Sequence, residues 1–200
     1  MASSLSIFCV GGLYVSCVLA SCSWLAAQTV RIAGELRQWH RVELLLDGPA
    51  SSESATPNPF LDYRMQVEFR HVDSNTLYRV AGYFAADGRA ADSSVDVGDQ
   101  WRALLSPDRV GPWRYTISFR RGAGVAISDD PRAGSAAAPW DGLAGLFTVG
   151  ESDKTGRDQR GKGRLRYVGR HHLRFANGEW FFKVGADSPE NLLAYEDFDN

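Results

Sequence analysis

Residues 113–120 read WRYTISFR, with a large apolar side chain at every second position. Successive side chains of a β-strand point to opposite faces, so this alternation gathers the apolar groups on one face. The apolar positions are Trp113, Tyr115, Ile117 and Phe119, and the polar positions are Arg114, Thr116, Ser118 and Arg120. The stretch therefore predicts a half-buried strand whose apolar face is mainly aromatic and belongs to a core.

A second stretch, RMQVEFR at residues 64–70, alternates in the same way and predicts another half-buried strand. Further strands are predicted at residues 39–46, 77–84, 101–105, 125–127 and 146–149. The first of these is closed by Asp47-Gly48-Pro49, and loops are expected at residues 50–59 and 131–139. About seven short strands with no helical period predict an all-β fold, an immunoglobulin-like antiparallel β-sandwich, which we place at residues 30–150.

Residues 150–163, GESDKTGRDQRGKG, are polar and punctuated by glycine, which is typical of a linker. Beyond them, residues 164–168 and 173–175 predict a small hairpin that leads into Trp180. His171 and His172 would be neighbours on a strand there. Their side chains would then point to opposite faces, so they would not bind one metal ion together.

The N-terminal residues resemble a secretory leader. Residues 7–20, IFCVGGLYVSCVLA, form an uncharged apolar run that is too short for an ordinary membrane span. We predict a signal peptide at residues 1–27 that is cleaved after Ala27. The alternative is a bacterial lipobox ending at Cys22, which would leave a lipid anchor at the cell surface. An uncleaved anchor or a misassigned start also stays open, because the first six residues contain no Lys or Arg.

Cysteine and charge narrow the classes of function. All three cysteines, Cys9, Cys17 and Cys22, lie in the leader, which excludes a disulfide or a cysteine nucleophile from the mature domain. The net charge of -2 points to no polyionic partner. Residues 154–174 are basic, but export argues against nucleic acid and favours a solvated face or pairing with the acidic end of the chain. Residues 153–158 lack the closing Glu of a calcium loop, and we expect neither metal nor cofactor.

The last stretch, residues 180–200, reads WFFKVGADSPENLLAYEDFDN. An apolar run from Trp180 to Val184 passes through Gly185 into a polar cluster that contains Asp187, Glu190 and Asn191. A strand followed at once by polar groups is typical of the first catalytic-face loop of a (β/α)8 barrel. We therefore expect residues 164–200 to begin a barrel that needs further sequence to close. The alternative is that this cluster caps a short helix starting at Pro189.

Five segments together carry a resemblance to a known family. They are GELRQWHRVELLLDGP (34–49), NPFLDYRMQVEFRH (58–71), GYFAADGRAADSSV (82–95), SPDRVGPWRYTISF (106–119) and KVGADSPENLLAYEDFD (183–199). The combination resembles the domain of unknown function 5060 family. That family is an N-terminal immunoglobulin-like domain in front of the barrel of bacterial secreted proteins classed as glycoside hydrolases, some of which also carry a collagen-binding domain.

The resemblance implies a role and a partner. It implies an accessory domain that supports or orients a catalytic barrel acting on polysaccharide, with Asp187, Glu190 and Asn191 binding sugar hydroxyls. In such barrels the catalytic carboxylates come from the fourth and seventh strands, so no catalytic residue is expected here and this chain alone should hydrolyse nothing.

Two other classes of function stay open. The sandwich could be a non-catalytic module that binds carbohydrate or collagen, or a structural spacer at the cell surface. For sugar stacking, the ring candidates are Trp101, Trp113, Tyr115, Tyr83 and Phe84, although alternation assigns Trp113 and Tyr115 to the core. Trp39 and Trp140 are freer candidates, but nothing in their spacing makes a site.

Overall fold

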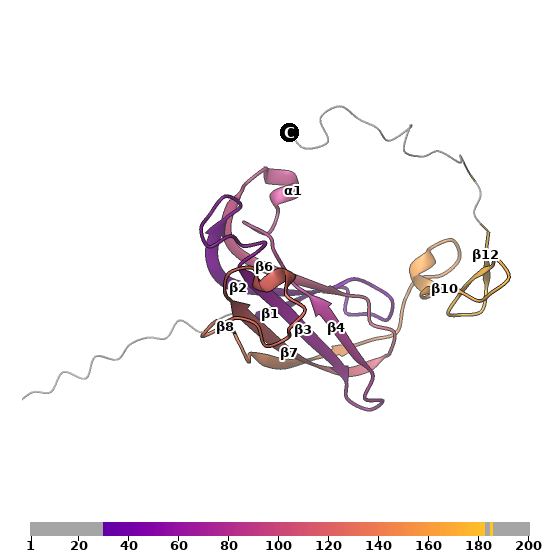
Figure 1. Cartoon of the computed structure of the whole chain (residues 1–200). Coiled ribbons are helices and arrows are strands. Elements are labelled where there is room, and N and C mark those ends of the chain that lie inside the picture. Colours follow the sequence, from indigo (N-terminus) through magenta and orange to yellow (C-terminus); the bar gives the residue numbers. More distant parts are fainter. Residues whose placement is uncertain (1–29, 183–184, 186–200) are drawn as a thin grey trace, which may run out of the picture.

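The computed structural model describes residues 30–182 and residue 185, and these residues form three antiparallel sheets (Figure 1). Two sheets pack face to face as a sandwich around one apolar core. The third, smaller sheet follows residues 150–163, which we call the connecting segment. The predicted all-β antiparallel sandwich is confirmed.

The first sheet has the order β1-β2-β6-β5. Its strands are β1 (Val30–Gly34), β2 (Val42–Ser52), β6 (Val97–Leu105) and β5 (Tyr83–Phe84). The second has the order β4-β3-β7-β8, and β9 also pairs with β7. Its strands are β4 (Leu77–Ala81), β3 (Tyr63–His71), β7 (Gly111–Arg121), β8 (Ser135–Ala136) and β9 (Ala144–Val149). The third contains β10 (Leu165–Tyr167), β11 (Leu173–Phe175) and β12 (Trp180–Phe181). The short helices are α1 (Ala90–Ser93), η1 (Val125–Ile127) and η2 (Gln159–Gly161).

The two alternating stretches form the centre of the second sheet, where β3 pairs with β7 along the full length of β3. Their inward side chains are buried, as the alternation predicted. Opposite them, β2 and β6 contribute Val42, Leu44, Leu46, Trp101, Ala103 and Leu105. The sheets meet where the rings of Trp101 and Phe119 lie 4.9 Å apart at 76°. Burying side chains of this size stabilises a fold by about 1.5–3 kcal/mol each.

The predicted single strand at residues 77–84 is wrong, because the chain changes sheets within it. Strand β4 pairs with β3 in the second sheet, whereas β5 pairs with β6 in the first. The change occurs at Gly82, where an added Cβ would lie 2.6 Å from the Met65 sulfur. Glycine is required at this position by the close approach of another side chain, which a strand pattern does not reveal.

Three other local predictions are corrected. The strand expected at residues 39–46 is β2, which begins at Val42 and continues through Asp47-Gly48-Pro49 with an irregular register. Gly48 is a packing position rather than a strand end, since a Cβ there would meet the Trp101 indole at 2.3 Å. Residues 125–127 form the 3-10 helix η1 rather than a strand. His171 lies in the turn before β11 with φ of 67°, not on a strand.

The hairpin predicted ahead of Trp180 is confirmed by the antiparallel pairing of β10 with β11. Strand β12 then pairs antiparallel with β11, which makes a three-stranded meander. Among the described residues, no helix has both the length and the apolar character needed to cross a bilayer.

Candidate functional site

Several predicted functional residues lie outside the described part of the chain. They are the sugar-binding candidates Asp187, Glu190 and Asn191, the signal peptide at residues 1–27 and the alternative anchor Cys22. Within the described residues, two other features carry chemistry. One is a polar cluster centred on Glu35, and the other is an apolar hollow at the edge of the sandwich.

The polar cluster joins the turn after β1 to the connecting segment. The Glu35 carboxylate lies 2.7 Å from His40 Nδ1, 3.2 Å from Lys154 Nζ and 2.9 Å from Arg160 Nη1. The other ring nitrogen of His40 lies 3.0 Å from Ser152 Oγ. We call these five residues the Glu35 clamp. Three of them come from the connecting segment, so the clamp ties that segment to the sandwich.

Backbone bonds reinforce the clamp at the start of the connecting segment. The Gly150 amide donates to the Leu36 carbonyl at 2.8 Å, and the Gln38 amide donates to the Gly150 carbonyl at 2.8 Å. The Arg37 guanidinium donates to the Glu151 carbonyl at 2.9 Å. Residues whose composition predicts a linker are therefore bonded to the sandwich over their first half.

Electrostatics keep the clamp charged. Hydrogen bonds from His40 and then Lys154 lower the pKa of Glu35. The hydrogen bonds of Lys154 to Asp153 and Glu35 raise the pKa of its ammonium group. In the same segment, the hydrogen bonds from the Arg160 guanidinium and then its amide lower the pKa of Asp158 to about 2. The carboxylates, the Lys154 ammonium and the Arg160 guanidinium are open to solvent, so the ion pairs between them are individually weak.

Ser152, His40 and Glu35 form a chain of hydrogen bonds, and the nucleophile, base and orienting acid of a hydrolase are connected in the same way. The surroundings oppose this interpretation. His40 is only 1% exposed, so a substrate does not reach its ring. Ser152 Oγ already accepts the Lys154 amide at 3.3 Å, within the connecting segment itself. The cluster is therefore built to position a segment, not to attack a substrate.

A metal ion is a second alternative for the same cluster. Glu35, His40 and Asp153 offer ligand atoms that lie within 4.8 Å of one another. However, the Lys154 ammonium lies 3.2 Å from the Glu35 carboxylate and 3.0 Å from that of Asp153. A side-chain cation thus already stands between the two carboxylates and supplies the positive charge that they need.

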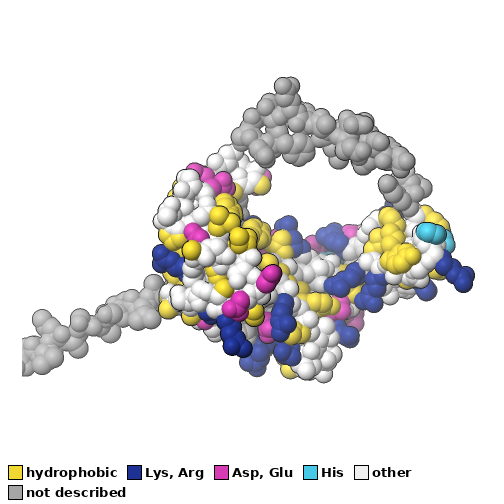
Figure 2. Space-filling model, viewed as in Figure 1, with side chains coloured by type: hydrophobic (Ala, Val, Ile, Leu, Met, Phe, Trp, Pro, Cys, Tyr) yellow, Lys and Arg dark blue, Asp and Glu magenta, His cyan; other side chains and the backbone are white. Residues whose placement is uncertain are grey.

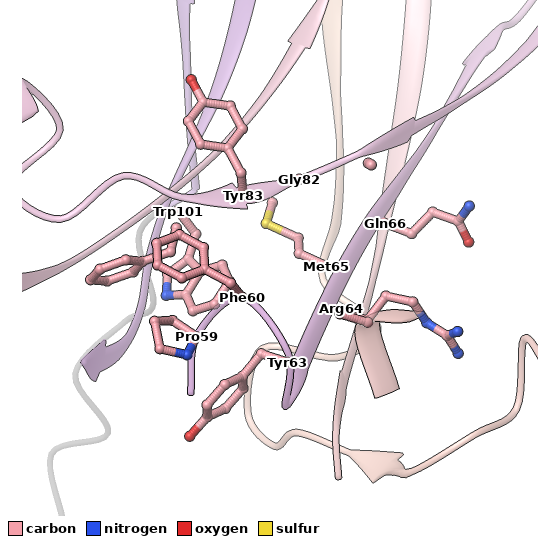
Figure 3. A pocket seen from close by; sticks show the side chains of 12 residues that line it. Pro59, Phe60, Tyr63, Arg64, Met65, Gln66, Gly82, Tyr83 and Trp101 are labelled. Atoms are coloured by element: carbon pink, nitrogen blue, oxygen red, sulfur yellow. The ribbon is translucent and has the colours of Figure 1, made fainter. Parts of the chain in front are cut away.

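The apolar hollow has a volume of about 240 Å³ and lies where β4 leaves β3. Figure 3 shows Phe60, Pro59 and Trp101 gathered on one side, with Arg64 and Gln66 on the other. Met65 and Trp101 are buried in its wall, whereas Phe60 is 49% exposed and Tyr83 is 43% exposed. The hollow is thus an opening in the sandwich bordered by two accessible rings.

The aromatic candidates named from the sequence separate into core and surface. Trp101, Trp113, Tyr115 and Phe84 are buried in the core. Trp140 packs against that core and donates its indole N–H to the Asp47 carbonyl at 2.9 Å. Of the rings named from the sequence, Tyr83 is the one that is largely exposed, whereas Trp39 and Trp140 are half-buried. Phe60 was not recognised as a candidate, although Asn58-Pro59-Phe60 was part of the family resemblance, because one aromatic residue in a loop has no periodicity.

The loop that carries Phe60 is fixed by hydrogen bonds. The Asp62 carboxylate accepts the amides of Asn58 at 2.8 Å and Gly124 at 3.0 Å. The bond from Gly124 and then the one from Asn58 lower the pKa of Asp62. The Phe60 amide donates to the Asn58 side chain at 2.9 Å. Phe60 is therefore held in place rather than exposed by a loose loop.

Comparison with known proteins gives two findings. Residues 35–120 match the family described as Domain of unknown function (DUF5060), as the resemblance indicated for that range. A crystal structure described as a putative glycoside hydrolase from Bacteroides vulgatus is similar, with 22% identity, a TM-score of 0.48 and 73% of this chain covered. The match covers 21% of that chain, so this chain spans about a fifth of its length. No curated protein matches.

Proposed function

We propose that this chain is the accessory sandwich of a secreted glycoside hydrolase and that it fixes the orientation of the domain that follows. The observation that carries the orienting role is the Glu35 clamp, which bonds the connecting segment to the sandwich. A flexible linker would leave relative domain motion free, whereas a bonded one restricts it. The family match at residues 35–120 supports an N-terminal accessory domain.

The small sheet follows the connecting segment, and the residues just before it also contact the sandwich. Arg164, just after the connecting segment, lies over the ring of Tyr78 on β4 at 5.5 Å. Gly163 packs on the Trp39 indole, which accounts for a ring that the sequence left as a free candidate. The residues that lead into the small sheet therefore contact the sandwich through a cation–π contact and close packing.

The small sheet also exposes apolar groups that a following domain would cover. Tyr167, Trp180 and Phe182 are all largely exposed, and apolar side chains gather on this sheet in Figure 2. In our proposal, residues 180–184, which begin with β12, form the first strand of a (β/α)8 barrel. Asp187, Glu190 and Asn191 then bind sugar hydroxyls at the catalytic face, as the family resemblance implies.

The rest of the proposal concerns location and fold class. Export through the signal peptide at residues 1–27 would place the protein outside the cytoplasm, and lipidation of Cys22 is the alternative. The immunoglobulin-like assignment rests on the number and spacing of the strands. The catalytic carboxylates belong to the barrel and not to this chain.

The test compares this chain with the protein encoded by the continued reading frame. We expect the longer protein to hydrolyse at least one polysaccharide, and residues 28–200 to hydrolyse none. In the longer protein, Asp187→Ala should weaken substrate affinity or turnover. Turnover by residues 28–200 alone would contradict the accessory role. A reading frame that ends at codon 200, or encodes no barrel, would remove the enzyme assignment.

A further inference from the structure

The change of sheets at Gly82 leaves one end of β3 uncovered. Strand β4 pairs with β3 only from Gln66 to Arg70, although β3 begins at Tyr63. The last bond on this side is from the Gly82 amide to the Met65 carbonyl at 2.9 Å. Beyond it, the apolar hollow opens into the side of the sandwich. An opening of this kind exposes apolar surface that would ordinarily be covered.

Two rings border this opening: Phe60, which packs against a neighbouring ring, and Tyr83, whose backbone is paired on β5. The Phe60 ring packs edge-on against Phe84, with the centroids 6.2 Å apart, and Phe84 packs against Trp101 at 5.4 Å. Tyr83 precedes Phe84 on β5 and points to the opposite face of the sheet, away from the core. Fixed rings lose little conformational entropy when a flat apolar surface stacks on them.

A second hollow adjoins the first and shares Tyr83 and Phe84 with it. Its volume is about 480 Å³, and it lies between α1 and the outer face of β2, β5 and β6. Its charged lining residues are Arg41, Glu43, Arg89, Asp92 and Arg102. The Glu43 carboxylate lies 2.7 Å from the Arg41 guanidinium and 4.0 Å from that of Arg102. The Arg102 Nε atom is buried with no hydrogen-bond partner among the described residues.

The combination of exposed rings with guanidinium and carboxylate groups indicates the chemistry of a ligand. Guanidinium groups only donate hydrogen bonds and carboxylates only accept them, so a ligand that uses both must offer acceptors and donors together. Hydroxyl groups do so. The cations of the second hollow are accompanied by carboxylates, which disfavours a polyanion. A ring platform next to such a polar hollow has the mixed lining of a ligand site.

We infer that the two hollows form a binding cleft for an uncharged polysaccharide, with sugar rings of the polymer stacked at Tyr83 and Phe60 and its hydroxyls facing Arg102, Arg41 and Glu43. This cleft lies on the sandwich itself, on residues other than those proposed to bind sugar after β12. Binding would bring the domain to its polymer without any hydrolysis. The inference is therefore independent of whether a catalytic barrel follows.

The test is affinity electrophoresis of the full chain in gels that contain hydroxyethyl cellulose, β-mannan or xylan, with polygalacturonate as a charged comparison. We expect at least one uncharged polymer to retard the chain. Tyr83→Ala should weaken the apparent affinity about tenfold or more, because stacked rings dominate contacts of this kind. Tyr83→Phe keeps the ring and should stay near the wild type. Tyr167→Ala removes a tyrosine ring on β10 that is more exposed than that of Tyr83, and it serves as the matched control.

Phe60→Ala is a second test, on a separate loop, in case the Tyr83→Ala variant does not fold. It should also weaken the retardation of the chain, and its melting temperature should stay close to that of the wild type. The cleft would be refuted if none of the three uncharged polymers retarded the chain. Retardation by polygalacturonate alone would also refute it, because that result would indicate charge attraction. Equal losses in Tyr83→Ala and Tyr167→Ala would place the binding elsewhere. Because no hydrolysis is measured, this outcome is separate from that of the proposed function.

Discussion

The sandwich core and the Glu35 clamp are held together by different physics. The core is a layer of buried apolar side chains between the two sheets, centred on the contact of Trp101 with Phe119. The clamp is a set of exposed charged groups around the buried ring of His40. Apolar burial depends little on pH or salt, whereas exposed ion pairs depend on both. The stability of the sandwich and the position of the connecting segment can therefore be disturbed separately.

The largest expected effect is in the core. Phe119→Ala removes a ring that is fully buried between the sheets, so we expect the free energy of unfolding to fall by about 3–5 kcal/mol. Denaturant unfolding of the full chain measures this. Phe182→Ala makes the same chemical change at a side chain that is 73% exposed, and it should cost no more than about 0.5 kcal/mol. Similar losses in both variants would contradict a core centred on Phe119.

The next effect concerns the clamp and is local. Glu35→Gln keeps the shape of the side chain but removes the charge that Lys154 and Arg160 share. We expect little change in global unfolding, because surface pairs are worth about 0–1 kcal/mol. The connecting segment should nevertheless open more often, and trypsin should cut it several-fold faster at Arg157, Arg160 and Lys162. Mass spectrometry of the fragments measures the rates.

Glu68→Gln is the matched control for that experiment. It removes a comparable exposed pair, in which Arg79 Nε lies 2.8 Å from the Glu68 carboxylate, between β3 and β4. Cleavage of the connecting segment should be unchanged in this variant. If Glu35→Gln left the cleavage rates at the wild-type level, the clamp would not hold the segment, and the proposed orienting role would lose its main support.

The difference between the core and the clamp also explains which parts of the structure could be predicted from the sequence. Alternation located β3 and β7 because burial on one face imposes a period of two, and that period is visible in a single stretch. The clamp joins Glu35 to Lys154 and Arg160, more than a hundred positions away, and such a pairing has no local signature. Composition therefore indicated a linker where the structure shows a bonded segment.

The candidate cleft was only partly foreseeable for a related reason. Tyr83 was named as a ring candidate together with Trp101 and Phe84, which are in fact core. What separates Tyr83 from Phe84 is the alternation of side chains on β5, which points Phe84 into the core and Tyr83 away from it. The change of sheets at Gly82, by contrast, opens the hollow beside these rings and depends on the contact of that glycine with Met65, which has no local signature.

The smallest expected effect is the response of the clamp to acid. In the folded chain the pKa values of Glu35 and Asp153 lie below their ordinary values, Glu35 mainly through the His40 hydrogen bond and Asp153 mainly through that of Lys154. That of Asp158 is about 2. A lowered carboxyl pKa contributes stability that is fully present above its ordinary value of about 4 and is lost as the pH falls through the folded value. The clamp should therefore stay closed from pH 7 to about 5 and open between about 4 and 2.

Amide hydrogen exchange, corrected for the intrinsic effect of pH, distinguishes this opening from unfolding. Residues 150–163 should lose protection in that acidic window while the paired amides of β3 and β7 keep theirs, because the side chains that hold these two strands in the core are mainly apolar. Raising the salt concentration at pH 7 should also lower the amide protection of the connecting segment, since screening weakens exposed ion pairs. Simultaneous loss of protection in both regions would mean that the clamp and the core form one cooperative unit, and the segment would then owe its position to the fold as a whole rather than to Glu35 and its partners.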